Sequence, residues 1–193
     1  NFLRCMRRVE EARTHIERSL AADPLSPLEL IEAAVVYLYL GDTQKAGSFM
    51  QEAVKLDPEF PPSVWGVAIL RAHGGKYAEA IAALEPATRA PRPDRLSLAL
   101  LGTLYSETGK TAEARKILGA LLLHPEIGQL QIANLYLRLG DKHKALEWHE
   151  RGFAERDPQM PWYAWTEPKH PLWKEPRFQA LLRRMNFPAA KRP

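Results

Sequence analysis

Histidine and cysteine are the side chains of this sequence that could bind a transition metal or act as a nucleophile. The chain contains one cysteine, Cys5, and six histidines: His15, His73, His124, His143, His149 and His170. A zinc site on a helix needs two histidines at positions i and i+4 with a carboxylate beside them. No two histidines have that spacing, and His143 and His149, six residues apart, fall on different helix faces. We therefore predict no metal site and expect His149 to fill a packing position.

Neither nucleophilic catalysis nor phosphate binding has a recognisable motif in the chain. A cysteine nucleophile needs a base and a group that orients the base. The histidine nearest to Cys5 in the sequence, His15, is unrelated to it by any such pattern. A phosphate-binding loop carries Lys followed by Ser or Thr, whereas Gly74-Gly75 is followed by Lys-Tyr. Because no nucleophile, base and orienting group can be named together, we predict that the chain is not an enzyme and binds no cofactor.

A recurring glycine indicates which elements the chain contains. Intervals of 34, 34 and 31 residues separate Gly41, Gly75, Gly109 and Gly140. An alanine stands five residues after each of these glycines: Ala46, Ala80, Ala114 and Ala145. A period in the mid-thirties is typical of arrays in which each unit is one helix–turn–helix. Glycine suits the turn because it adopts positive φ without strain, and alanine lets the second helix approach the first.

The period divides the chain into repeated units and an extension. The predicted units are 1–24, which is partial, 27–60, 61–94, 95–125 and 126–158, followed by an extension over 159–193. The segment Ser26-Pro27-Leu28-Glu29 has the form of a helix start, with a capping serine, a proline at the first helical position and a glutamate three residues after the serine. Gly41-Asp42 is expected to turn the chain, and Asp57-Pro58 to end the return helix.

These units resemble the tetratricopeptide repeat. That motif has a small residue and an aromatic in its first helix, a glycine at the turn, and two small residues and a terminal proline in its second. The second unit has all of them: Ala34, Tyr37, Gly41, Ala46, Ala53 and Pro58. The fourth unit matches through Gly102, Tyr105, Gly109 and Ala114. The third unit departs with Arg71 in the aromatic position and the fifth with Gly152 in the late small position. The resemblance, over residues 1–158, implies an all-α, right-handed solenoid of about four and a half antiparallel helix pairs.

In the tetratricopeptide fold the first helix of each unit lines a concave groove, and helical spacing selects the side chains that face it. The apolar and aromatic half of this predicted groove consists of Val35, Tyr39, Trp65, Ile69 and His73. The polar half consists of Thr103, Ser106, Glu107, Asn134 and Arg138. We expect a peptide or helix of a protein partner to bind here. Two alternatives stay open: a small molecule enclosed by the groove and the extension, and packing of these side chains against a further N-terminal repeat.

The extension is rich in aromatic residues and proline. Its aromatics are Trp162, Tyr163, Trp165, Trp173, Phe178 and Phe187, and its prolines interrupt any long helix before Glu175. A short helix is predicted over Pro176–Met185, where Phe178, Leu181, Leu182 and Met185 share one face. The extension is expected to cover the last apolar face of the solenoid; a partner-like segment lying in the groove is the alternative.

A second resemblance concerns the last 65 residues or so. The segments Leu139–Lys142, Ala145–Trp148, Glu155–Pro158 and Glu175–Met185 are similar to the C-terminal end of tetratricopeptide modules in bacterial multidomain signalling proteins. Such modules follow winged-helix regulators, nucleotide cyclases or Ser/Thr kinases. The resemblance implies a signalling or transcription-regulatory role for the chain.

Composition limits the possible partners. The net charge is +4, and the basic residues near the two ends are not interleaved with aromatics in the way that stacks bases, so we do not expect nucleic acid as a partner. No apolar stretch approaches the length of a membrane span. A single cysteine fits a reducing compartment, and we expect a cytoplasmic location. Asn1–Met6 has the pattern of a helix end, so we expect a piece of a longer protein, with an apolar face that a second copy could cover.

Overall fold

The computed structural model describes residues 9–58, 60–88, 94–123, 128–160 and 171–185. In these ranges the chain is all-α, without a strand. The helices are α2 (Val9–Ala22), α3 (Pro27–Tyr39), α4 (Thr43–Leu56), α5 (Pro61–His73), α6 (Tyr77–Thr88), α7 (Arg95–Glu107), α8 (Thr111–Leu122), α9 (Gln129–Arg138), α10 (Lys142–Ala154) and α11 (Pro176–Arg184).

Helix starts follow from local capping chemistry. Ser26 precedes α3, and its Oγ accepts a hydrogen bond from the backbone N–H of Glu29 at 3.4 Å, as the sequence predicts. Aspartate carboxylates cap three later helices in the same way: Asp42 before α4, Asp94 before α7 and Asp141 before α10. Each accepts from the backbone N–H three residues on, at 2.7–3.0 Å. These caps satisfy donors that a helix start leaves without a partner.

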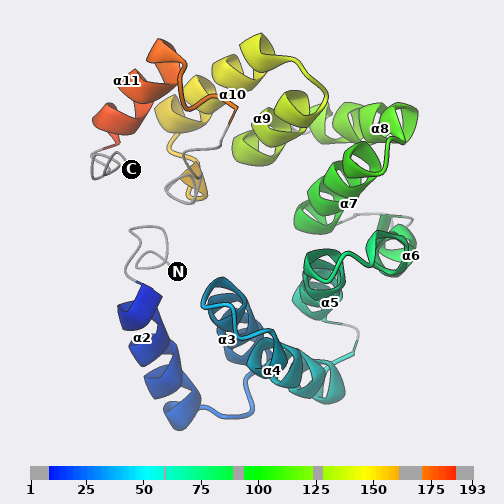
Figure 1. Cartoon of the computed structure of the whole chain (residues 1–193), viewed down its shortest axis with the longest axis vertical. Helices are drawn as coiled ribbons and strands as arrows, with labels where there is room; N and C mark the ends of the chain where they lie inside the picture. Colours follow the sequence, from blue (N-terminus) through cyan, green and yellow to red (C-terminus); the bar gives the residue numbers. More distant parts are fainter. Residues whose placement is uncertain (1–8, 59, 89–93, 124–127, 161–170, 186–193) are drawn as a thin grey trace.

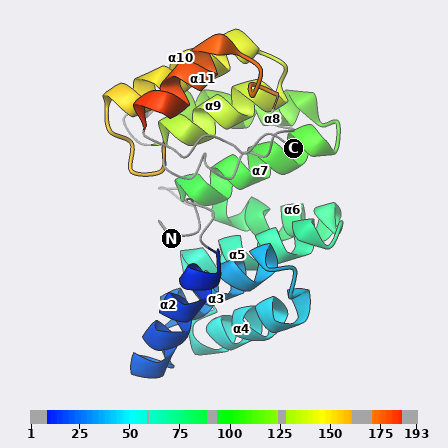
Figure 2. The same ribbon diagram turned by 60° about the vertical axis from the view of Figure 1, so that its left-hand side comes forward.

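The helices form an open, C-shaped solenoid. Helices α3, α5, α7 and α9 lie on its inner side, whereas α4, α6, α8 and α10 lie outside them (Figure 1). Turned by 60°, the molecule shows the helix pairs following one another along its long axis, from α2–α4 to α10–α11 (Figure 2). The first helix of each unit therefore lines the concave side, as the resemblance implied.

Two kinds of glycine hold the helix pairs together. The turn glycines adopt positive φ, between 74° and 87°, and no neighbouring atom lies within 4 Å of the position a Cβ would occupy: Gly41, Gly75, Gly109 and Gly140. They are needed for backbone conformation and not for space. Gly66 and Gly102 lie inside helices instead, and a Cβ there would come within 2.5 Å and 2.9 Å of neighbouring side chains. These two glycines allow close helix packing.

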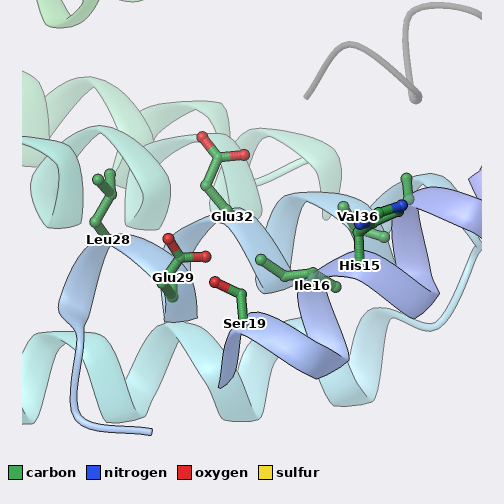
Figure 3. A pocket seen from close by; sticks show the side chains of 8 residues that line it. His15, Ile16, Ser19, Leu28, Glu29, Glu32 and Val36 are labelled. Carbon is green, nitrogen blue, oxygen red and sulfur yellow. The ribbon is translucent and has the colours of Figure 1, made fainter. Parts of the chain in front are cut away.

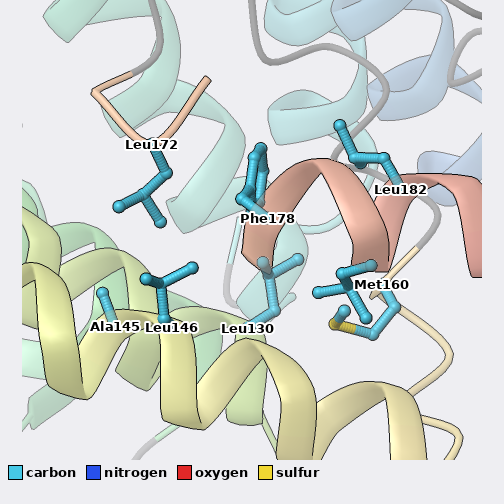
Figure 4. Close-up of a cluster of buried hydrophobic side chains, with 8 residues drawn as sticks. Leu130, Ala145, Leu146, Met160, Leu172, Phe178 and Leu182 are labelled. Carbon is cyan, nitrogen blue, oxygen red and sulfur yellow. The ribbon is translucent and has the colours of Figure 1, made fainter. Parts of the chain in front are cut away.

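The extension caps the last repeat. Met160, Leu172 and the α11 residues Phe178, Leu181 and Leu182 form one buried cluster with side chains of α9 and α10 (Figure 4). His149 fills a fully buried position in this layer, and its ring lies 5.7 Å from that of Phe178. Both the packing role predicted for His149 and the capping role of the extension are confirmed. The aromatic residues Trp162, Tyr163 and Trp165, on which the groove-bound alternative rests, lie outside the described residues.

Candidate partner-binding surface

Helix α5 contributes three of the predicted groove residues. Trp65 and Ile69 are half-buried and His73 is exposed near the end of the helix. Ile69 packs against the buried cluster shared by α3 and α4. Trp65 belongs to none of the buried clusters formed by the described residues. A partly exposed indole beside a fixed aliphatic side chain is the arrangement that anchors partners at protein interfaces.

Helices α7 and α9 bring the polar predicted residues together. The Ser106 hydroxyl donates to the backbone carbonyl of Arg138 at 3.2 Å, and the Arg138 guanidinium forms an ion pair with Glu107. These contacts join the C-terminal ends of two successive inner helices. The Thr103 hydroxyl donates to the Ala99 carbonyl of its own helix at 2.9 Å. The polar half is therefore braced by its own hydrogen bonds, with the charged groups still partly exposed.

The remaining predicted groove residues differ in accessibility. Val35 on α3 is only 7% exposed, so it adds little to an open surface. Asn134 on α9 is half-buried. The side chain of Tyr39 lies outside what the structure describes. Among the predicted groove residues whose side chains the structure describes, Trp65 provides the partly exposed indole.

A clamp between units was not predicted from the sequence. The Tyr37 hydroxyl donates to Glu17 of the preceding unit at 2.6 Å and accepts from the Lys45 ammonium at 2.9 Å. This hydrogen bond raises the pKa of Lys45 above its usual value. Tyr105 repeats the contact, donating to Glu85 at 2.9 Å. A spacing of 20 residues between glutamate and tyrosine, present twice, was the signal in the sequence.

Arg71 stands where the repeat has an aromatic residue, and it still joins the two helices of its unit. Its guanidinium donates to the backbone carbonyl of Glu79 at 3.2 Å and lies 3.9 Å from the Glu79 carboxylate. Glu79 follows Arg71 by eight residues, as Lys45 follows Tyr37. A cation and a carboxylate thus join the two helices of the third unit in place of tyrosine and lysine.

Sequence profiles described as tetratricopeptide repeat match residues 30–60 and 68–129. These two stretches of the chain carry tetratricopeptide repeats. No curated protein sequence matches the chain significantly. Tetratricopeptide proteins in general are interaction scaffolds and not enzymes.

Solved structures share the fold of these repeats. A tetratricopeptide protein of Thermus thermophilus is 23% identical with a TM-score of 0.65, over 93% of this chain and 94% of that one. A chain of the Cut9–Hcn1 hetero-tetramer of the APC/C is 18% identical with a TM-score of 0.60, over 92% of this chain and 36% of that one. A tetratricopeptide protein of Parabacteroides merdae is 20% identical with a TM-score of 0.58, over 95% of this chain and 73% of that one. At these identities the likeness shows the tetratricopeptide solenoid alone.

A hollow of about 510 Å³ lies between α2 and α3, at the N-terminal end of the described repeats. The side chains of Leu28, Glu29 and Glu32 line it from α3, and Ile16 lines it from α2 (Figure 3). This hollow was not predicted from the sequence, because it depends on how the faces of two helices meet.

Two other classes of site find no support among the described residues of the tetratricopeptide array. They contain no group of three or more His, Cys, Asp or Glu side chains placed to hold a metal ion. None of the described helices is both long and apolar enough to cross a membrane. The sequence alternative of a small molecule enclosed by the extension depends on residues 161–170, outside the described ranges.

Proposed function

We propose that this chain is a protein-interaction module whose concave face binds a peptide or helix of a protein partner. Trp65 carries the proposal: it is a half-buried indole on an inner helix, outside the described buried clusters. Aromatic anchors of this kind supply a large part of interface binding energy. A chain of similar fold assembles with other proteins in the Cut9–Hcn1 hetero-tetramer, which supports a protein as the partner.

The polar half of the concave face is proposed to set the orientation of the bound segment. Glu107 and Arg138 offer a carboxylate and a guanidinium side by side, each at least one-third exposed. Polar main-chain and side-chain groups of an extended peptide can pair with both. The apolar contact at Trp65 would then provide affinity, and the charged pair at α7–α9 would provide register.

The wider setting is proposed from the second sequence resemblance. The segments that resemble bacterial signalling modules begin at the turn before α10 and end with α11. We propose that the array serves a cytoplasmic signalling or transcription-regulatory protein of a bacterium, in which partner capture controls an effector domain.

Site-specific photocrosslinking tests the concave surface. A photoreactive residue at His73, exposed on an inner helix, is compared with one at Lys116, exposed on the outer helix α8. In a bacterial lysate the His73 probe should give a discrete product, and Trp65→Ala should lower its yield about tenfold or more. Circular dichroism verifies that the variant is folded. Equal products from both probes, or an unchanged yield in the folded Trp65→Ala variant, would exclude the concave face as the binding surface.

A further inference from the structure

The last turns of α10 and α11 carry three exposed arginines. Arg183 and Arg184 stand at the end of α11, and Arg156 follows the end of α10. The Arg184 guanidinium lies over the Phe153 ring, 4.6 Å from its centre, and this contact joins the last turns of the two helices. Both helices end on the same side of the molecule (Figures 1 and 2). We call these three arginines the arginine patch.

The carboxylates that follow α10 in the chain already have partners elsewhere. Glu155 accepts hydrogen bonds from the side chains of Arg151 and Gln129. Asp157 is buried, and its carboxylate accepts from the backbone N–H of Leu130 at the start of α9. Both acidic side chains next to Arg156 in the sequence are therefore engaged within the last repeat.

The rest of this end of the chain does not balance the patch. Glu150 is paired with Arg177 through two hydrogen bonds of 3.0 Å and 2.7 Å, and Glu175 stands at the opposite end of α11. None of the three patch arginines has an ion pair with a carboxylate that the structure describes. Residues 161–170 contain one Glu and one Lys, and residues 186–193 contain two basic residues and no acidic one. Neither segment brings a net negative charge.

Arg156 has a backbone conformation that favours glycine. Its φ is 57°, and in the described part of the chain it is the one residue other than glycine with a positive φ. The turns that follow α3, α5, α7 and α9 each have glycine in this conformation. A Cβ makes the conformation costly, so glycine would suit this turn better. The backbone therefore does not explain why a long cationic side chain stands here.

Arg184 is held in place by packing and not by a counter-ion. A guanidinium that lies over an aromatic ring keeps the N–H groups at its edge available for hydrogen bonds. Those N–H groups match the two oxygens of a carboxylate. Because the ring contact already restricts the side chain, less conformational freedom is lost when an anion binds.

We propose that the arginine patch docks an acidic segment of a protein partner, whose Asp or Glu carboxylates pair with the three guanidinium groups. The small size of the patch favours a short run of carboxylates over a nucleic-acid backbone, which binds through many more phosphate contacts. Phe153 lies under Arg184 and so is not presented for stacking with bases. The patch is separate from the concave surface around Trp65, so either can fail without the other.

Fluorescence anisotropy with the full chain tests the proposal. The probe is a short, labelled, acetylated and amidated peptide of aspartate, glutamate and glycine, and its matched control carries lysine for each acidic residue. The acidic peptide should bind, and less tightly as the salt concentration rises. Arg156→Gly/Arg183→Gln should weaken it about fivefold, because two exposed charge pairs are lost. The control variant Arg115→Gln/Lys116→Gln removes equal charge from the exposed face of α8 and should leave binding unchanged.

Stability measurements separate a docking role of Arg156 from a structural one. Arg156→Gly removes the Cβ from a residue with positive φ, so it should raise the midpoint of urea unfolding. The same variant should weaken the acidic peptide. A lower midpoint together with weaker binding would mean that Arg156 supports the fold and would overturn its docking role.

A photoreactive acidic peptide locates the contact, and its crosslinks should fall within residues 151–156 and 180–185. Absence of binding, equal binding of the two peptides, equal weakening by both double variants, or crosslinks on α5 or α7 would overturn the proposal. So would a single-stranded oligonucleotide of equal charge that binds more tightly and is weakened by Arg156→Gly/Arg183→Gln, because the patch would then recognise phosphates. Trp65→Ala should leave binding of the acidic peptide unchanged, which separates this result from the test of the concave surface.

Discussion

Phe178 is predicted to be the anchor that holds the cap on the solenoid. Its side chain is fully buried among Leu130, Leu146, Leu172 and neighbouring residues, and its ring lies against that of His149. Phe178→Ala removes a complete aromatic side chain from this layer. Such truncations lower the free energy of unfolding by about 3–5 kcal/mol, through lost transfer free energy and the cavity left behind.

The loss should be concentrated at one end of the molecule. In a repeat array each unit contacts only its neighbours, so local stability is lost first where the contact is removed. Amide hydrogen exchange should therefore accelerate strongly in α9, α10 and α11 and little in α3 and α4. Urea unfolding followed by circular dichroism gives the total loss.

Two control variants test whether the loss of stability comes from the buried aromatic ring. Leu123→Ala removes a leucine that is 76% exposed and should change the free energy of unfolding by less than about 0.5 kcal/mol. Phe178→Leu keeps most of the buried volume and should cost clearly less than the alanine variant. A loss below about 1 kcal/mol for Phe178→Ala, or exchange that accelerates equally in every helix, would refute the anchoring role.

The other predictions concern backbone packing and charge. Gly102→Ala should destabilise by about 1–3 kcal/mol in urea unfolding, because its Cβ would lie 2.9 Å from two core side chains; Gly119→Ala, in open space on α8, should stabilise by about 0.5–1 kcal/mol. The two substitutions must change the free energy of unfolding in opposite directions. The hydrogen bonds from Arg151 and then Gln129 hold the pKa of the Glu155 carboxyl below its usual value. The hydrogen-bonded, ionised Glu155 carboxylate therefore stabilises the fold at pH values above the pKa that Glu155 has in the unfolded chain. This contribution is lost as the pH falls through the lowered pKa of the folded state. NMR titration should show the pKa of Glu155 rising in Arg151→Gln, and an unchanged value would refute this cause.

Much of the fold follows from short-range patterns. The helix start predicted at Pro27 is that of the structure, and α4 begins at Thr43, directly after the turn predicted at Gly41-Asp42. Such signals are reliable because caps, prolines and glycine turns act within a few residues of where they stand. The C-terminal helix was predicted one residue too long, to Met185, which is its C-cap. The first described helix begins at Val9.

The candidate sites were less accessible to sequence reasoning. Helical spacing placed Val35 in the groove, yet this side chain is 7% exposed, because spacing assigns a face and not the depth of its neighbours. The hollow beside Glu29 and Glu32 was not predicted, because in the sequence two glutamates at the start of a helix resemble any solvated surface.

What the sequence by itself determined is the period: glycine turns, small residues after them and helix caps, each a local preference of the backbone. The tertiary structure decided which side chains of different helices meet. Arg71 donates to Glu79, Tyr37 donates to Glu17, and the ring of Phe178 lies against that of His149. It also decided which surfaces stay open, at Trp65 and at the α2–α3 hollow. The physical reason is that packing depends on which faces of distant helices meet, and no single helix carries that information.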